Sequence, residues 1–226
     1  MRQLVLDLSR PPAPTLENFA PGSNADAVAV LRAWLAGTLD ERCVYLCGPS
    51  GSGKSHLLRA LAQAVQDSGR SVAQVEADDL ALLESAVALP SVVAIDDVQR
   101  LSAAGQSALF RLFHRLRDED LRLLVAGDVP PAGLTLREDV RTRLGAGLVL
   151  QLRLLSDQEK AEALRSHAAG RGFELVPEMI DYLLRHARRD LPSLLAMLDA
   201  LDQYSLQTKR PITLPLLREV LQGART

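Results

Sequence analysis

A glycine-rich segment that ends in lysine and serine is the part of the sequence best suited to chemistry. Residues 48–55 match the P-loop pattern G-x-x-x-x-G-K-[ST] without a gap. Glycines let backbone N–H groups turn towards phosphate oxygens, and a helix that follows adds the partial positive charge of its N-terminus. The segment therefore predicts a nucleotide-phosphate site formed by Gly48, Pro49, Ser50, Gly51, Ser52, Gly53, Lys54, Ser55 and His56.

Two side chains of this segment would contact phosphate and metal directly. Lys54 can reach the β- and γ-phosphates, and the Ser55 hydroxyl can ligate Mg²⁺. Lysine is rare in this chain, where only Lys54, Lys160 and Lys209 stand among 26 lysines and arginines. The alternative is a glycine turn that fits the pattern by chance, but an apolar run before the loop and a helical pattern after it favour the P-loop.

Two acidic residues follow an apolar run at residues 92–95. Asp96, at the end of a strand, would hold Mg²⁺ through its water shell, and Asp97 could orient or deprotonate an attacking water. A pair of solvated acids at a strand end is the alternative, but the position after a P-loop favours the Walker B interpretation.

Asp128 ends a later apolar run in a Gly-Asp pair. It would stand near a γ-phosphate if its strand lies beside the P-loop strand, and it would otherwise be a turn residue.

The surrounding sequence alternates short apolar runs with helical patterns up to about residue 154. Strands are predicted at residues 44–46, 72–75, 92–95, 121–126 and 148–152. Helices are predicted between them at residues 25–36, 54–66, 80–88, 103–116 and 137–144. After Ser156 only helical patterns remain, at residues 157–169, 177–188, 192–206 and 214–222. This order is typical of an α/β domain with a parallel sheet, followed by a small all-α domain.

Composition excludes several classes of protein for these 226 residues. A net charge of −2 argues against a strongly basic nucleic-acid binder, and 4% aromatic residues argue against a base-stacking surface. Cys43 and Cys47 would lie on the same side of a strand, too far apart to form a disulfide with each other, and this suits a reducing compartment. No signal peptide and no membrane-length apolar run is present, so we expect a cytoplasmic protein that does not contact a membrane.

In combination these motifs resemble the AAA+ ATPases, and among them the clade of the bacterial replication initiator DnaA. The likeness extends from Leu16 to Leu221, and the P-loop, the Ile-Asp-Asp-Val-Gln segment at 95–99 and the segment 139–147 carry it together with Asn18-Phe19. The resemblance implies an α/β AAA+ P-loop core with a five-stranded parallel sheet, followed by a helical lid. It also implies that ADP or ATP, with Mg²⁺, binds at their junction. The expected domains are residues 1–15, a clamp-binding peptide and proline-rich linker, residues 16–154, the core, and residues 155–226, the lid.

The first residues of the chain carry a second resemblance. Residues 3–8, Gln-Leu-Val-Leu-Asp-Leu, look like the Q-L-x-L-x-L peptide by which bacterial proteins dock on the replicative sliding clamp, and a proline-rich spacer follows them. Three spaced leucines at an exposed terminus have no core of their own and usually belong to a partner. A stray edge strand would have the same pattern. The predicted clamp-binding side chains are Gln3, Leu4, Leu6 and Leu8.

Arg143 occupies the position of the arginine finger in this family. A guanidinium delivered across an interface stabilises charge on a transferred phosphoryl group and accelerates the reaction by about 10³–10⁵. The alternative is a surface arginine paired with Glu138 or Asp139. Arg141 is expected to be a second interface contact.

The lid departs from the family at one position. The family usually places an arginine, the second sensor, near the start of a lid helix, whereas Pro192 stands there in this sequence. Proline fits the first turn of a helix but cannot contact phosphate, and Arg188 or Arg189 would have to replace the arginine. The departure predicts weak or no intrinsic ATPase activity, with tight binding of the diphosphate.

The layout of clamp peptide, linker, core and lid is similar to that of regulators in the DnaA clade. It implies a protein that binds the DNA-loaded sliding clamp, is nucleoid-associated through it, and promotes hydrolysis of DnaA-bound ATP through Arg143. Re-initiation of replication would thereby be prevented. DNA would be contacted only indirectly, and formation of a homodimer stays open. A helicase-loader-type AAA+ ATPase, with robust DNA-stimulated hydrolysis, is one alternative. A non-catalytic module that binds DnaA or the clamp, and inhibits without Lys54 and Arg143, is another.

Overall fold

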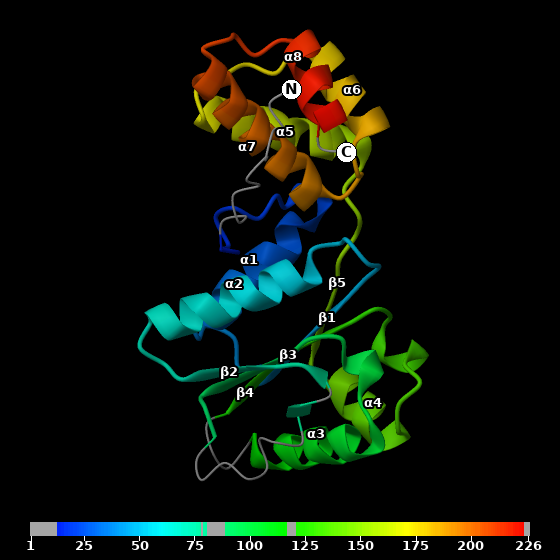
Figure 1. Ribbon diagram of the computed structural model, residues 1–226. Helices are drawn as coiled ribbons and strands as arrows, with labels where there is room; N and C mark the ends of the chain where they lie inside the picture. The colour runs from blue at the N-terminus through cyan, green and yellow to red at the C-terminus, as the bar shows by residue number, and fades with distance from the viewer. Residues whose placement is uncertain (1–12, 78, 81–88, 117–120, 224–226) are drawn as a thin grey trace. The chain divides into compact units, whose positions relative to one another are not determined.

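The computed structural model describes residues 13–77, 79–80, 89–116 and 121–223 (Figure 1). These residues form two compact units, one within Ala13–Leu154 and one within Leu155–Thr226. The predicted clamp peptide, with Gln3, Leu4, Leu6 and Leu8, lies outside the described residues, as does most of the helix predicted at residues 80–88.

The first unit is built on a five-stranded sheet in which every neighbouring pair is parallel. The strands are β1 (Cys43–Cys47), β2 (Val72–Val75), β3 (Val92–Ile95), β4 (Arg122–Gly127) and β5 (Leu148–Gln151). Their order, β2-β3-β4-β1-β5, confirms the predicted fold class. Because all strands run in the same direction, the segments that follow β1, β3 and β4 leave the sheet at one edge, where open α/β sheets bind ligands.

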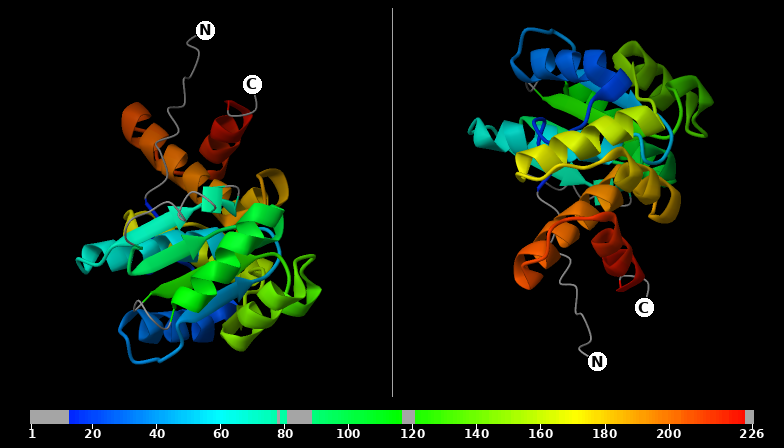
Figure 2. Two further views of the ribbon diagram at one scale, coloured as in Figure 1. Left: turned by 90° about the horizontal axis from the view of Figure 1, so that it is seen from below. Right: turned by 90° about the horizontal axis from the view of Figure 1, so that it is seen from above.

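Helices cover both faces of this sheet (Figure 1). They are α1 (Ala25–Leu35) and α2 (Lys54–Asp67) on one face, and α3 (Ala103–Arg115) and α4 (Glu138–Ala146) on the other. The view from below in Figure 2 looks onto the face that α3 covers. Short 3₁₀ turns stand at Gly22–Asn24, Val98–Arg100 and Pro131–Gly133.

Strand β1 is buried on both faces, which explains its uninterrupted apolar sequence. Cys43, Tyr45 and Cys47 pack in the core beneath α3 and α4, whereas Val44 and Leu46 pack in the core beneath α1 and α2. Both thiols are free and buried. The prediction that they share one face of a strand is therefore confirmed.

Trp34, the one tryptophan of the chain, anchors α1 against the sheet. Its side chain is 1% exposed, and its indole N–H donates a hydrogen bond of 2.7 Å to the carbonyl of Glu41. The Arg122 guanidinium lies 5.6 Å from the ring centroid and donates to the Trp34 carbonyl. The ring thus has a structural role.

The second unit is all-α, with helices α5 (Asp157–Gly170), α6 (Pro177–His186), α7 (Leu191–Thr208) and α8 (Leu214–Gly223). Ser156 begins α5 with a capping box in which its hydroxyl accepts from the Glu159 N–H and the Glu159 carboxylate accepts from the Ser156 N–H. The prediction that α6 reaches Arg188 was wrong. Extended backbone at Ala187 ends the helix, because Asp190 already caps the next one.

A buried carboxylate links two helices of this unit. Asp199 on α7 accepts a hydrogen bond from His167 Nε2 at 2.6 Å and forms an ion pair with Arg171, whose Nε lies 2.7 Å from Asp199 Oδ1. Asp199 is 9% exposed, so these two partners compensate for the removal of its charge from water.

Within the described residues, no helix is long and apolar enough to cross a membrane.

Candidate nucleotide site and arginine surface

The P-loop connects β1 to α2 with backbone that only glycine adopts easily. Gly51 and Gly53 have φ angles of +82° and +96°, in the left-handed region. Lys54 then begins α2 with a residue exposure of only 8%. Its Nζ donates hydrogen bonds of 2.7 Å to the Gly48 carbonyl and 3.1 Å to the Pro49 carbonyl. The loop therefore encloses a buried cation at the N-terminus of a helix.

The same loop also contains the buried hydroxyl of Ser52. Its Oγ has no hydrogen-bond partner among the described residues. A buried polar atom without a partner is costly unless a ligand or water completes it. Ser55 stands in the first turn of α2, next to Lys54. A phosphate group fits this set of a cation, an unpaired hydroxyl and a helix N-terminus.

An N-terminal segment packs onto the loop. The Phe19 ring lies so close to Gly53 that a Cβ built there would be 2.5 Å from Phe19 Cε2. The Phe19 and His56 rings are 5.4 Å apart, and His56 Nε2 is 3.0 Å from the Thr15 carbonyl oxygen. Burial lowers the pKa of His56 and so favours the neutral ring, whose Nε2–H donates to Thr15. The structure thus places the predicted site residue His56 against Thr15 and Phe19.

The strand register brings the predicted acids to the edge of the sheet that carries the P-loop. Cys47 pairs with Gly127, so Asp128 follows β4 directly beside the start of the loop. Ile95 pairs with Val125, so Asp96 follows β3 on the other side of β4. The condition set for Asp128, a strand beside the P-loop strand, is therefore met.

Asp97 stands in a conformation that few residues other than glycine adopt. Its φ and ψ are 49° and 46°, and its Oδ1 accepts a 3.0 Å hydrogen bond from Gln99 Nε2. The remaining amide oxygen of Gln99 is buried without a partner among the described residues. Gln99 therefore restrains the second acid. The sequence interpretation missed this role, although Gln99 belongs to the motif at residues 95–99.

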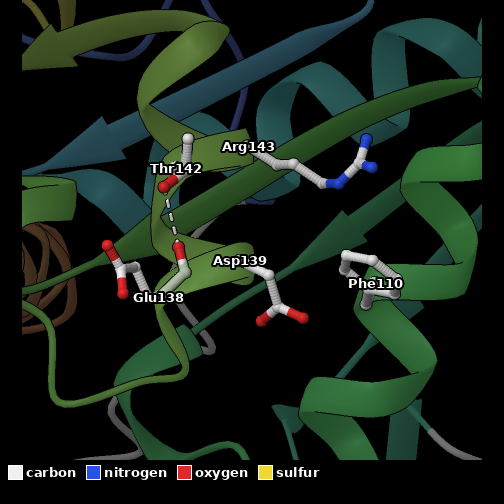
Figure 3. A pocket seen from close by; sticks show the side chains of 5 residues that line it. All are labelled: Phe110, Glu138, Asp139, Thr142 and Arg143. Carbon is white, nitrogen blue, oxygen red and sulfur yellow. Dashed lines mark hydrogen bonds between the residues drawn. The ribbon is translucent and has the colours of Figure 1, made fainter.

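Arg143 belongs to a different surface, on the side of α3 and α4 (Figure 3). Its side chain extends from α4 over Phe110 of α3, with the guanidinium 4.9 Å from the ring centroid. One guanidinium nitrogen is 3.3 Å from His114 Nε2. An open hollow of about 650 Å³ lies here, lined by Phe110, Glu138, Asp139, Thr142 and Arg143.

The ion pair suggested as an alternative for Arg143 is not formed. Asp139 pairs with Arg137 at 2.5 Å, and no carboxylate of the described residues lies within 4.0 Å of the Arg143 guanidinium. Arg141 turns elsewhere, because residues two apart on a helix do not share a face. Its NH1 donates to the Ala132 carbonyl at 3.3 Å.

Pro192 stands in the first turn of α7, as predicted. Arg189 is engaged within the lid, where it donates to Asp157 Oδ2 at 3.3 Å and to the Leu184 carbonyl at 3.4 Å. Arg188 has a side chain that is 87% exposed. The Arg189 side chain is also largely exposed, at 67%, and Arg188 Nε lies 3.9 Å from Asp190 Oδ2, so each of the two arginines considered as replacements for the second sensor has a carboxylate neighbour.

Comparison with known families assigns both units. Residues 12–151 match the model of the bacterial DnaA ATPase domain. Residues 157–221 match the model described as Hda, lid domain.

Solved structures agree with these matches. The replication initiator DnaA bound to AMPPCP and single-stranded DNA is 25% identical, with a TM-score of 0.71 over 88% of this chain and 68% of that chain. Domain III of DnaA from Thermotoga maritima is 21% identical, with a TM-score of 0.76 over 95% of this chain and 98% of that one. The RuvB Holliday junction branch migration motor of Thermotoga maritima shares the fold at 18% identity, with a TM-score of 0.67 over 92% and 71% of the two chains.

Proposed function

Since this chain belongs to the family of bacterial DnaA ATPase domains and is an AAA+ protein with an Hda-type lid, we propose that it regulates the initiation of chromosome replication. The observation that carries the proposal is the pairing of these two units, a DnaA-type core at residues 12–151 followed by an Hda-type lid at residues 157–221. The regulator acts on DnaA, whose own ATPase domain has the same fold.

The proposed regulator binds ATP or ADP at the P-loop. Support comes from the buried Lys54 amine and the unpaired Ser52 hydroxyl, which suit phosphate oxygens. Ser55 and Asp96 have the oxygen donors that Mg²⁺ prefers, and the bound ion would neutralise charge on the phosphates. In this proposal Asp97 orients water and Asp128 contacts the terminal phosphate.

Arg143 is proposed to act on the nucleotide of a neighbouring DnaA molecule. The guanidinium stands at an open hollow with an aromatic ring and an imidazole as neighbours, and it forms no ion pair with a carboxylate of the described residues. A cation in such a position can stabilise the negative charge of phosphoryl transfer. Arg141 is proposed as a further contact to DnaA.

Residues 3–8 are proposed to dock on the replicative sliding clamp. Only the sequence supports this part of the proposal, through Gln3 and the spaced leucines Leu4, Leu6 and Leu8. Docking would concentrate the regulator where DNA has just been replicated, because two linked binding events raise the effective concentration of the second.

Hydrolysis of ATP pre-bound to DnaA is the test, with the regulator added in the presence and absence of clamp loaded on DNA. Acceleration that requires loaded clamp is expected. Arg143→Ala should remove the acceleration, whereas Arg59→Ala, at an exposed arginine on α2, should keep it. Gln3→Ala should reduce the dependence on clamp.

Each alternative function predicts a different result in the same experiment. A helicase loader would hydrolyse ATP itself on addition of DNA and would leave DnaA-bound ATP unchanged. A non-catalytic module would inhibit initiation in the Lys54→Ala and Arg143→Ala variants as well as in the wild type. Either result would replace the proposed function.

A further inference from the structure

Arg143 does not extend freely from α4, because two residues of α3 contact its side chain. The guanidinium lies 4.9 Å from the centroid of Phe110 and 3.3 Å from His114 Nε2. Phe110 and His114 are one helical turn apart, and their rings meet edge to face at 4.7 Å. Arg143, Phe110 and His114 thus form one group, which we call the arginine cradle.

The contact with His114 has a defined direction. A guanidinium has only donors and stays charged at all working pH values, so the imidazole must accept. His114 Nε2 must therefore lack a proton, and the proton of the neutral ring must be on Nδ1. A protonated ring would lose the acceptor and would place a second positive charge beside the guanidinium.

We propose that Phe110 and His114 are positioning residues that hold the Arg143 guanidinium over the hollow beside α4. This inference rests on the proposed function for its effect on hydrolysis, but the contacts of the cradle are formed within this chain and need no partner. An arginine side chain has several rotatable bonds, and holding it in advance reduces the entropy lost when it engages a partner's phosphate.

Charged groups of α3 and α4 surround the cradle. From the side of α4, Arg143 and Arg137 both place guanidinium groups near Phe110, at 4.9 and 5.6 Å from the ring centroid. The carboxylate of Asp139 is engaged with Arg137, and Glu138 lines the hollow. On α3 itself, the remaining charged residues are Arg111 and Arg115, which have interactions of their own.

The activity test compares variants at saturating and subsaturating regulator, with DnaA-bound ATP and clamp loaded on DNA. Phe110→Leu should lower the maximal rate about two- to fivefold, from the loss of a cation–π contact, and should leave the half-saturating concentration unchanged. His114→Gln, whose amide oxygen accepts at every pH, should keep the maximal rate within about twofold. His114→Lys should lower it about tenfold, through like-charge repulsion.

The pH profile separates positioning from mere packing. Acidification that protonates His114 should lower the wild-type maximal rate relative to that of His114→Gln measured at the same pH, because the protonated ring cannot accept from the guanidinium. Taking this ratio removes the pH dependence of DnaA and of the clamp. Equal profiles, or a change only in the half-saturating concentration, would mean that His114 merely contacts the partner.

A second measurement needs neither DnaA nor clamp. In ¹⁵N–¹H spectra of the isolated protein, the Arg143 Nε–Hε signal, assigned with Arg143→Lys, should carry a ring-current shift that Phe110→Leu removes. The ¹⁵N signals of His114 should report the Nδ1–H tautomer. If both NMR results are obtained but the hydrolysis of DnaA-bound ATP is not stimulated, the cradle is retained and the proposed function is rejected. Normal stimulation without the ring-current shift would reject the cradle alone.

Discussion

Gly53→Ala tests the packing of the N-terminal segment on the P-loop. The substitution adds one methyl group where the backbone has φ +96° and where a Cβ would lie 2.5 Å from Phe19 Cε2. Gly69→Ala is the matched control, because Gly69 has φ +79° and no heavy atom within 4 Å of the added Cβ. Both variants carry the backbone cost, and only the first carries the clash.

The two costs can be estimated separately. A non-glycine residue in the left-handed region loses about 1–2 kcal/mol, which is the whole expected effect at Gly69. Forcing a methyl group into an occupied space adds typically about 1–3 kcal/mol. Gly53→Ala should therefore destabilise the protein by about 2–5 kcal/mol. In a Phe19→Ala background the second cost disappears, and the remaining effect should approach that of Gly69→Ala.

Urea unfolding without nucleotide is the assay, so that lost ligand binding does not enter the comparison. Fluorescence of Trp34, the one tryptophan, reports on the unit that contains both glycines, because its side chain is 1% exposed. The double-mutant cycle of Gly53→Ala with Phe19→Ala isolates the clash. Equal destabilisation by the two glycine substitutions, or a coupling free energy near zero, would show that Phe19 does not rest on the loop.

Three further predictions concern buried polar groups. Tyr45→Phe should lower the free energy of unfolding by about 1–2 kcal/mol in urea titrations, because the buried hydroxyl donates a 2.7 Å hydrogen bond to the Val129 carbonyl. Burial raises the pKa of the Cys43 thiol to about 12, so an aromatic disulfide reagent should label it only after unfolding. Above about pH 9 the unfolded thiol loses its proton whereas the folded thiol keeps it, and this difference lowers the free energy of unfolding. The stability that Cys43 contributes is therefore complete below about pH 9, and urea titrations should show it falling as the pH rises towards 12. Asp199→Ala should destabilise the lid by about 1–3 kcal/mol in circular dichroism melts, since His167 loses its carboxylate partner.

Most elements of the fold could be predicted from the sequence because each has a local cause. The apolar run at 92–95 is strand β3 without adjustment, and Ser156 with Glu159 begins α5 where the capping box requires. The C-terminus of α6 could not be placed correctly. The predicted helix included residues 187 and 188, but Asp190 and Pro192 start a new helix, and this requires a turn before it.

The site was predictable only as far as its motifs are contiguous. The P-loop and the acids after β3 are local signals, whereas the position of Asp128 depended on β4 lying between β3 and β1. Strand order is a property of the whole sheet and leaves no trace in a short segment. The contact of Arg143 with His114 spans 29 residues, so no contiguous motif contains both.

The strand order also bears on the order in which the protein is made. Strand β1 (Cys43–Cys47), which lies inside the sheet, has β4 (Arg122–Gly127) and β5 (Leu148–Gln151) as its neighbours, both synthesised later. The backbone N–H of Leu152 completes this pairing at the Cys47 carbonyl, immediately before the P-loop. At about 5–20 residues per second, a ribosome needs several seconds to deliver the strand partners of β1, and the β1 side chains that face α3 and α4 stay uncovered meanwhile. The nascent strand is therefore a natural substrate for chaperones, and the phosphate-binding loop is among the last parts of its domain to form.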